Sequence, residues 1–146
     1  MIRSMKEQDR EVVIDMMYQF YNSPAVITNG SEEIFNNNFD ACINEWPTVR
    51  GYVLIDECDV VGYAITAKSY STEFGRECIW IEDLYIQKEY RGRGLDTEFI
   101  QYLRSLYSSY VLRLEAEVYN SRALETYKKN GFMELPYAEM IALPKR

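Results

Sequence analysis

Histidine is absent from these 146 residues. Without imidazole, Ser-His and Cys-His nucleophile pairs are excluded, as is nearly every zinc site built with histidine, so we expect no metal. No apolar run approaches 18 residues, which argues against a membrane partner, and residues 1–6 have no apolar stretch of the signal-peptide type. The three cysteines are far apart and match no CxxC spacing, as is typical of a reducing compartment. A cytoplasmic protein is therefore expected.

Positive charge is also scarce. Sixteen Lys and Arg stand against 23 Asp and Glu, a formal net charge of −7. This balance argues against a general affinity for nucleic acid, because binding to a phosphate backbone needs a basic face. Cationic small molecules or basic peptides would meet a favourable long-range field instead. With 47% hydrophobic and 27% charged residues, and no repeat or linker, residues 1–146 fit a single globular domain.

The hydrophobic period changes along the chain and predicts an α+β fold. Helical spacing covers residues 7–21. A second helix, which Ser31 could cap, would run to about residue 44. Helical spacing then returns after Gly94 and over residues 121–130. Gly131 then stands where a left-handed residue ends a helix. Strand patterns cover residues 2–4, 52–56, 60–68, 78–86, 111–118, 132–135 and 137–143. The three middle strands, separated by polar turns, predict an antiparallel meander.

A glycine loop between a strand and a helix carries the sharpest chemical signal: Arg91-Gly92-Arg93-Gly94. Glycine lets the backbone turn tightly and approach a ligand closely. The following helix start would offer free N–H groups and partial positive charge to an anion such as a diphosphate. A merely flexible helix entry is the alternative interpretation. The loop is neither a Walker loop nor a dinucleotide fingerprint, because no Gly-Lys-Ser/Thr and no third glycine follows.

Residues 82–86 with this loop resemble the acyl-CoA loop of the GNAT N-acetyltransferase superfamily. Residues 118–132 are similar to that family's Asn-x-x-Ala-x-x-x-Tyr-x-Lys-x-Gly-Phe segment, with every anchor present. The resemblance implies acetyl-CoA as co-substrate. It also implies a mixed, mostly antiparallel twisted sheet of about seven strands with about four helices, splayed between the fourth and fifth strands. More weakly, Ile81-Glu82-Asp83-Leu84-Tyr85-Ile86 resembles diamine and polyamine acetyltransferases.

The resemblance also implies catalytic roles. Glu82 would take the amine proton through water, the Leu84 N–H would stabilise the carbonyl oxygen, and Tyr127 would protonate the leaving thiolate. Glu82 and Asp83 would face the substrate, although Asp83 alternates to the opposite face and could be structural. A carboxylate in so apolar a strand is costly unless paired, and burial would raise its pKa. Two alternatives stay open: Glu82 paired with Lys or Arg, and Tyr127 as a plain core residue.

The implied cofactor-binding positions gather on the strand, the loop and the later helix. They are Leu84, Tyr85, Ile86, Arg91, Gly92, Arg93, Gly94, Leu95, Asp96, Thr97, Asn120, Tyr127 and Lys129. Asp96 departs from the family pattern, which has Gly or Ala there. A carboxylate beside a phosphate would weaken binding, whereas a carboxylate in a first helical turn favours the helix dipole.

The resemblance, together with the acidic charge of the chain, implies an N-acetyltransferase that moves an acetyl group from acetyl-CoA to a primary amine of a small cationic or peptide acceptor. A thioester is already activated, so no protein nucleophile is required. A non-catalytic acyl-CoA-binding or regulatory module is the alternative, and a protein-interaction domain with no CoA site is a third. We expect residues 18–46 to build the acceptor side and, by analogy with relatives, a homodimer.

Overall fold

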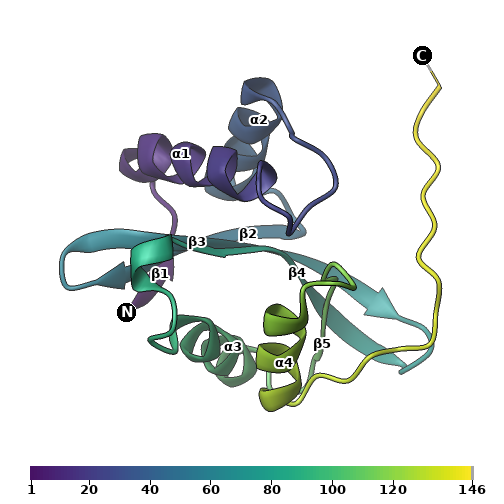
Figure 1. The fold of residues 1–146 in the computed structure, drawn as a ribbon. Coiled ribbons are helices and arrows are strands. Elements are labelled where there is room, and N and C mark those ends of the chain that lie inside the picture. Colours follow the sequence, from purple (N-terminus) through teal and green to yellow (C-terminus); the bar gives the residue numbers. More distant parts are fainter. Residues whose placement is uncertain (146) are drawn as a thin grey trace.

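The computed structural model describes residues 1–145 as one sheet with two helices on each face (Figure 1). In chain order the elements are β1 (Ile2–Ser4), α1 (Arg10–Tyr21), α2 (Glu32–Ile43), β2 (Val49–Asp56), β3 (Asp59–Ser71), β4 (Arg76–Ile86), α3 (Leu95–Leu106), β5 (Val111–Leu114) and α4 (Ser121–Lys129). Short 3-10 turns at Glu7–Asp9 and Lys88–Tyr90 precede α1 and the glycine loop. The expected α+β class, the four helices and the meander are confirmed.

The sheet has the order β1-β2-β3-β4-β5, and only its last pair is parallel. That pair is short. It joins residues 78–81 of β4 to Val111–Leu114, while β4 itself continues to Ile86. Beyond Ile81, the side of β4 that faces β5 has no strand partner. The pairing ends where β5 ends, so the splay between the fourth and fifth strands stays a prediction.

A β-bulge interrupts β4 at Glu82. Ile81 stands opposite Thr66 of β3 and Asp83 stands opposite Ile65, so Glu82 has no counterpart. Bulges bend a strand and re-aim side chains, and they are common beside active sites. The bulge lies just past the last residue of β4 that pairs with β5.

Each face of the sheet buries its own core. On one face, α1 and α2 pack Met17, Phe35 and Phe39 against inward-facing residues of β2, β3 and β4. On the other, α3 contributes Phe99 and Leu103, which pack against Tyr52 and its neighbours. Strand side chains alternate between faces, so one sheet serves both cores.

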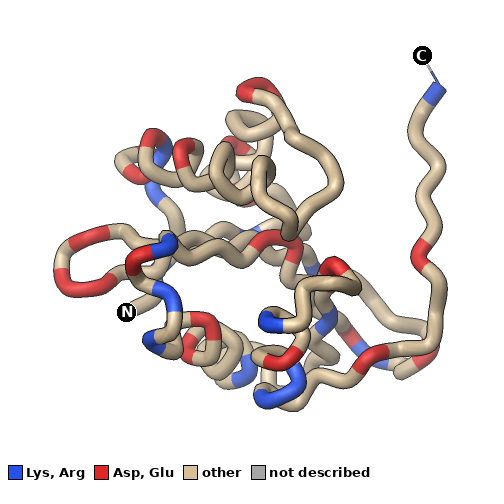
Figure 2. The backbone as a smooth tube through the Cα atoms, in the orientation of Figure 1, with Lys and Arg blue, Asp and Glu red and all other residues tan. Residues whose placement is uncertain are grey.

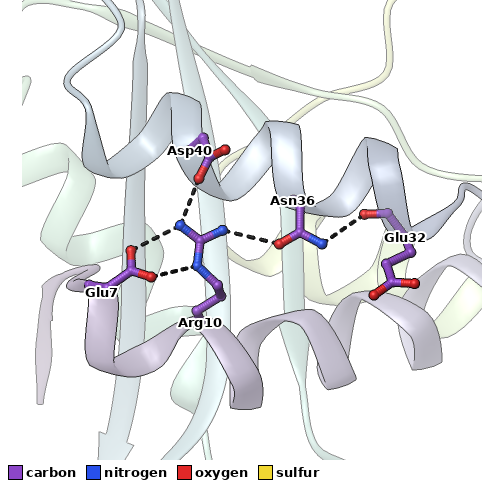
Figure 3. Close-up of polar contacts among 5 residues, drawn as sticks. All are labelled: Glu7, Arg10, Glu32, Asn36 and Asp40. Atoms are coloured by element: carbon purple, nitrogen blue, oxygen red, sulfur yellow. Dashed lines mark hydrogen bonds and ion pairs between the residues drawn. The ribbon is translucent and has the colours of Figure 1, made fainter.

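Arg10 joins α1 to α2 (Figure 3). Its guanidinium donates to both carboxylate oxygens of Glu7, at 2.7 and 2.9 Å, to Asn36 at 3.1 Å and to Asp40 at 2.6 Å. Asn36 in turn donates to the Glu32 carbonyl at 3.0 Å. A planar guanidinium can serve several acceptors at once, so Arg10 links the two helices, which also pack through Tyr18 and Phe35. At the start of α2, the Ser31 hydroxyl caps the Ile34 N–H at 3.1 Å, as expected.

The prediction of about seven strands is wrong for the described residues, which form five. Residues 132–135 and 137–143 are not strands, and β5 ends at Leu114 rather than at residue 118. Between Met133 and Lys145 no residue takes part in a backbone–backbone hydrogen bond. An alternating pattern becomes a strand only where another strand pairs with it, and Pro136 and Pro144 also lack a backbone donor. Across residues 1–145, no helix has the length and apolar character of a membrane span.

Candidate functional site

The glycine loop approaches α3 through two left-handed residues. Gly92 has φ +79° and Gly94 has φ +78°, and Gly94 is the N-cap of α3. A Cβ at either position would meet no atom within 4 Å, so the glycines serve the backbone turn rather than close packing. The open space above them leaves room for an anion near the start of α3, where helix N–H groups have no intrahelical partner.

Three basic residues lie in this loop and the turn before it, in a stretch where Figure 2 marks Lys and Arg in blue along the backbone. Lys88 belongs to the preceding turn. Arg91 donates from Nε to the Ile86 carbonyl at 2.9 Å and lies 5.3 Å from the Tyr85 ring centre, so it folds back over the end of β4. Arg93 pairs with Asp56 at 3.2 Å, an exposed contact that solvent weakens. Each of these contacts uses one guanidinium nitrogen, so the other N–H groups of both arginines could still meet a bound anion.

Asp96 and Thr97 tie the first turn of α3 to α4. The Asp96 carboxylate accepts from the Thr97 N–H at 2.8 Å, and the Thr97 hydroxyl accepts from the Asn130 amide at 3.0 Å. Asp96 also lies close enough to Tyr127 to raise the pKa of that phenol. The carboxylate therefore occupies a helix-start N–H group of the kind that a phosphate would use.

The end of β4 supplies the remaining strand positions. Leu84 and Ile86 pack towards the core beneath α3 and α4, whereas Tyr85 faces the other core and donates its hydroxyl to Gln19 at 2.7 Å. Because the ladder with β5 stops at Ile81, an extended ligand could add to this side of β4 by main-chain hydrogen bonds.

Glu82 lies at the bulge and is exposed, contrary to the expectation that an apolar strand would bury it. Its pKa is raised, first by partial desolvation and then by the negative charges of Asp83 and Glu139. No Lys or Arg within residues 1–145 forms an ion pair with it. An accessible carboxylate with a raised pKa suits proton transfer at neutral pH.

Asp83, its neighbour, is the buried carboxylate. Tyr21 donates to one of its oxygens at 3.0 Å and Tyr63 to the other at 2.8 Å. Burial raises the pKa of Asp83, and the two phenols partly oppose that rise. Because tyrosines hold both of its oxygens, Asp83 fits the structural role better than the substrate-facing one. Of the two carboxylates expected to face the substrate, only Glu82 is therefore accessible.

Helix α4 carries three predicted site residues. Tyr127 lies near the start of α3, whereas Asn120 and Lys129 make contacts within α4. Tyr127 is half-buried against Phe132, and desolvation raises its pKa further than Asp96 does. The Asn120 side chain caps α4 by accepting from the Ala123 N–H at 3.3 Å. Lys129 forms an exposed pair with Glu125. An open groove of about 470 Å³ runs along this helix, lined by Ser121, Leu124, Glu125, Lys128 and Lys129.

Two carboxylates near Glu82 escaped the sequence prediction. Glu115 follows the last residue of β5, and its hydrogen bond with Glu139 raises its pKa to about 7. Charge repulsion from Glu82 contributes to the same rise. Strand alternation marks Glu115 as polar, but only the register, with Leu114 opposite Ile81, places it beside Glu82. The three carboxylates form a negative surface where β4 and β5 separate.

This chain is similar in sequence to proteins of one known family. Residues 14–132 match the model of the acetyltransferase (GNAT) family. The thialysine N-epsilon-acetyltransferase of Bos taurus is 39% identical over 83 residues, and that of Mus musculus is 32% identical; each match covers 55% of this chain and 48% of the relative. The chain thus spans about half the length of these curated relatives.

Solved structures share the fold over the whole chain. A possible acetyltransferase from Clostridium difficile 630 superposes with a TM-score of 0.83 at 18% identity, covering 100% of this chain and 98% of the other. AAC(6')-Iy, solved in complex with the bisubstrate analog CoA-S-monomethyl-acetylneamine, gives 0.77 at 14% identity, covering 100% and 97%. At these identities the likeness concerns the fold.

Proposed function

The chain belongs to the acetyltransferase (GNAT) family, and from that premise we propose that it transfers an acetyl group from acetyl-CoA to a primary amine. One observation carries the proposal. The unpaired side of β4 beyond Ile81 runs directly into the open glycine loop at the start of α3. An extended pantetheine arm could lie along that strand with its diphosphate at the helix N-terminus.

The residues that would hold acetyl-CoA follow from this arrangement. The main chain of Leu84, Tyr85 and Ile86 would bind the pantetheine arm. The diphosphate would take N–H groups of the loop and the first turn of α3, with added attraction from the nearby basic side chains. These positions are Arg91, Gly92, Arg93, Gly94, Leu95, Asp96 and Thr97. Asn120 uses only its amide oxygen as the cap of α4 and Lys129 pairs only with the exposed Glu125, so the amide N–H groups of Asn120 and the ammonium of Lys129 could also contact the cofactor.

The transfer requires the amine to lose a proton, the thioester carbonyl to be attacked and the thiolate to be reprotonated. Glu82 would accept the amine proton through water, because it is exposed and its pKa is raised. The Leu84 N–H would stabilise the developing oxyanion. Tyr127 would return a proton to the CoA thiolate, leaving CoA-SH and the amide as products.

We propose a small cationic amine, such as a diamine or polyamine, as the acceptor. The negative surface of Glu82, Glu115 and Glu139 and the net charge of −7 would attract it. The relatives named for thialysine, an amine substrate, support the same class. An amino group on a peptide or an aminoglycoside would meet the same chemistry. Three unpaired thiols and the use of acetyl-CoA support a cytoplasmic setting.

Thiol release from acetyl-CoA tests the proposal, with putrescine, spermidine, an aminoglycoside and a lysyl peptide as acceptors. We expect amine-dependent release of CoA, greatest for the di- and polyamines. The second candidate, a non-catalytic acyl-CoA-binding module, is favoured by Asp96 and would give thermal protection by CoA without release. Neither protection nor release would overturn both.

A further inference from the structure

Arg91 is an exposed residue at the start of the glycine loop, yet its guanidinium is held at two points. Its Nε donates to the Ile86 carbonyl at 2.9 Å, and its Cζ lies 5.3 Å from the centre of the Tyr85 ring. A cation over an aromatic face is attracted by the electrons of the ring. Among the hydrogen bonds of residues 1–145, Arg91 uses only Nε of its side chain, so both terminal nitrogens keep their N–H groups for a ligand.

The Tyr85 ring that Arg91 covers is itself fixed in the core. Tyr85 is 6% exposed, and its ring centre lies 5.9 Å from that of Phe20 and 6.3 Å from that of Tyr63. Its hydroxyl donates to Gln19 of α1 at 2.7 Å. Because the ring is packed on its core side and hydrogen-bonded at its tip, it offers Arg91 a surface of one orientation.

The two arginines of the loop differ in what holds them. Arg93 lies over the Tyr90 ring at 5.0 Å and also pairs with the carboxylate of Asp56 at 3.2 Å. No carboxylate within residues 1–145 forms an ion pair with Arg91. An aromatic ring orients a cation without cancelling its charge. Arg91 is therefore both oriented and free of a competing anion.

We propose that Tyr85 is a positioning residue for the cofactor, whose buried ring holds the Arg91 guanidinium ready for the CoA diphosphate. This role rests on the function proposed above. Binding loses affinity when it must order a long, mobile side chain, and the ring orders Arg91 before CoA arrives. The role belongs to the side chain of Tyr85 and is separate from the main-chain contacts with pantetheine, which any residue at this position would supply.

Calorimetric titration of CoA into the full chain tests the role of the ring. Tyr85→Leu should bind CoA roughly 5-fold more weakly than wild type, because Arg91 must then be ordered on binding. Tyr85→Phe keeps the ring and should bind like wild type. Phe20→Leu is the matched control, since it alters the same aromatic cluster on the core side of Tyr85, and it should also bind like wild type. Equal affinity in Tyr85→Leu and wild type would overturn the proposal.

Acetyl-pantetheine, which has the thioester but no phosphate, separates positioning from a general effect on the core. Tyr85→Leu should raise KM for acetyl-CoA at unchanged kcat and should keep the wild-type kcat/KM for acetyl-pantetheine. In an Arg91→Ala background, Tyr85→Leu should cause no further loss of CoA affinity, because the two residues act through one contact. Equal losses with both thioesters, or losses that add in the double variant, would overturn the proposal.

Arg91→Lys tests the contact from the other side and applies even if Tyr85→Leu does not fold. Lysine keeps the positive charge but lacks the planar guanidinium that lies over a ring, so this variant should bind CoA more weakly than wild type. Wild-type affinity in Arg91→Lys would overturn the role of Tyr85. A wild type that binds no CoA would overturn the proposed function and this role together, whereas CoA binding that none of these variants weakens would overturn the role of Tyr85 alone.

Discussion

Tyr21 donates its hydroxyl to the carboxylate of Asp83 across 3.0 Å and so connects the last residue of α1 to the middle of β4. Sixty-two positions separate the two residues in sequence. The bond fixes the end of the helix that borders the expected acceptor side, and it lies one residue from the bulge at Glu82. The buried carboxylate of Asp83 thus joins the end of α1, on the expected acceptor side, to the residue next to the proposed base.

Asp83 predicts a pH-dependent stability. Its pKa in the folded protein is raised, so the folded state binds more protons than the unfolded one between the ordinary value, 3.8, and the raised value. The stabilisation that this group contributes to the folded state is complete below pH 3.8. It is lost as the pH rises through the pKa of the folded state. Relative to wild type, Asp83→Asn should therefore gain stability as the pH rises through this window.

Urea unfolding at several pH values measures the difference between the two proteins. Tyr21→Phe is the companion variant. It should lose about 2 kcal/mol at neutral pH, because a buried carboxylate loses one of its two donors. A constant difference between wild type and Asp83→Asn across pH would show that Asp83 does not titrate in this way.

Glu82→Gln should lower kcat by about 10²-fold or more, because the amide cannot accept a proton. In wild type the acid limb of the kcat/KM profile should lie above pH 4.5, since the pKa of Glu82 is raised. Asp83→Asn should move that limb to lower pH by removing a neighbouring negative charge. Glu11→Gln, on the exposed side of α1, is the control and should match wild type. An unchanged rate in Glu82→Gln would assign the proton transfer to another group.

Tyr127→Phe should keep the fold and CoA binding while lowering turnover by roughly 10²-fold. The phenol is half-buried, and desolvation and Asp96 both keep it protonated. Tyr119→Phe provides a comparison on an exposed tyrosine of the preceding turn. Steady-state rates and calorimetric titration of CoA together check the prediction. Full activity in Tyr127→Phe would return this residue to a core role.

The sequence predicted the parts of the fold that depend on local pattern. In α3, the helical spacing of the apolar residues predicts one buried face, and Phe99, Ile100 and Leu103 are fully buried, whereas Leu106 at the end of that face is exposed. Gly92 and Gly94 adopt left-handed backbone conformations, as a tight turn into α3 requires. These features succeed because period and glycine content act within a few residues of the chain.

The misses share a different cause, because each depends on a partner distant in sequence. The bulge that exposes Glu82 arises from the pairing of β4 with β3, and Asp83 is buried because Tyr21 and Tyr63 reach it from other elements. Residues 137–143 alternate like a strand, yet no neighbouring strand pairs with them. Register and partner availability are tertiary properties that a single alternating pattern does not contain.

Asp96→Ala should strengthen CoA binding. The carboxylate accepts from the Thr97 N–H at 2.8 Å, so it both repels a diphosphate and occupies a donor at the start of α3. Two unit charges about 5 Å apart repel by about 3 kcal/mol at an effective dielectric of 20, and solvent and salt reduce this. We expect CoA to bind roughly 10-fold more tightly, with the gain shrinking as salt is added.

Asp96→Asn is the companion variant, because it keeps an acceptor for the Thr97 N–H without the charge. Equal gains in both variants would assign the effect to the charge. A gain in Asp96→Ala alone would assign it to the freed N–H donor. Isothermal titration of CoA decides, and unchanged affinity in both variants would place the diphosphate away from this helix start.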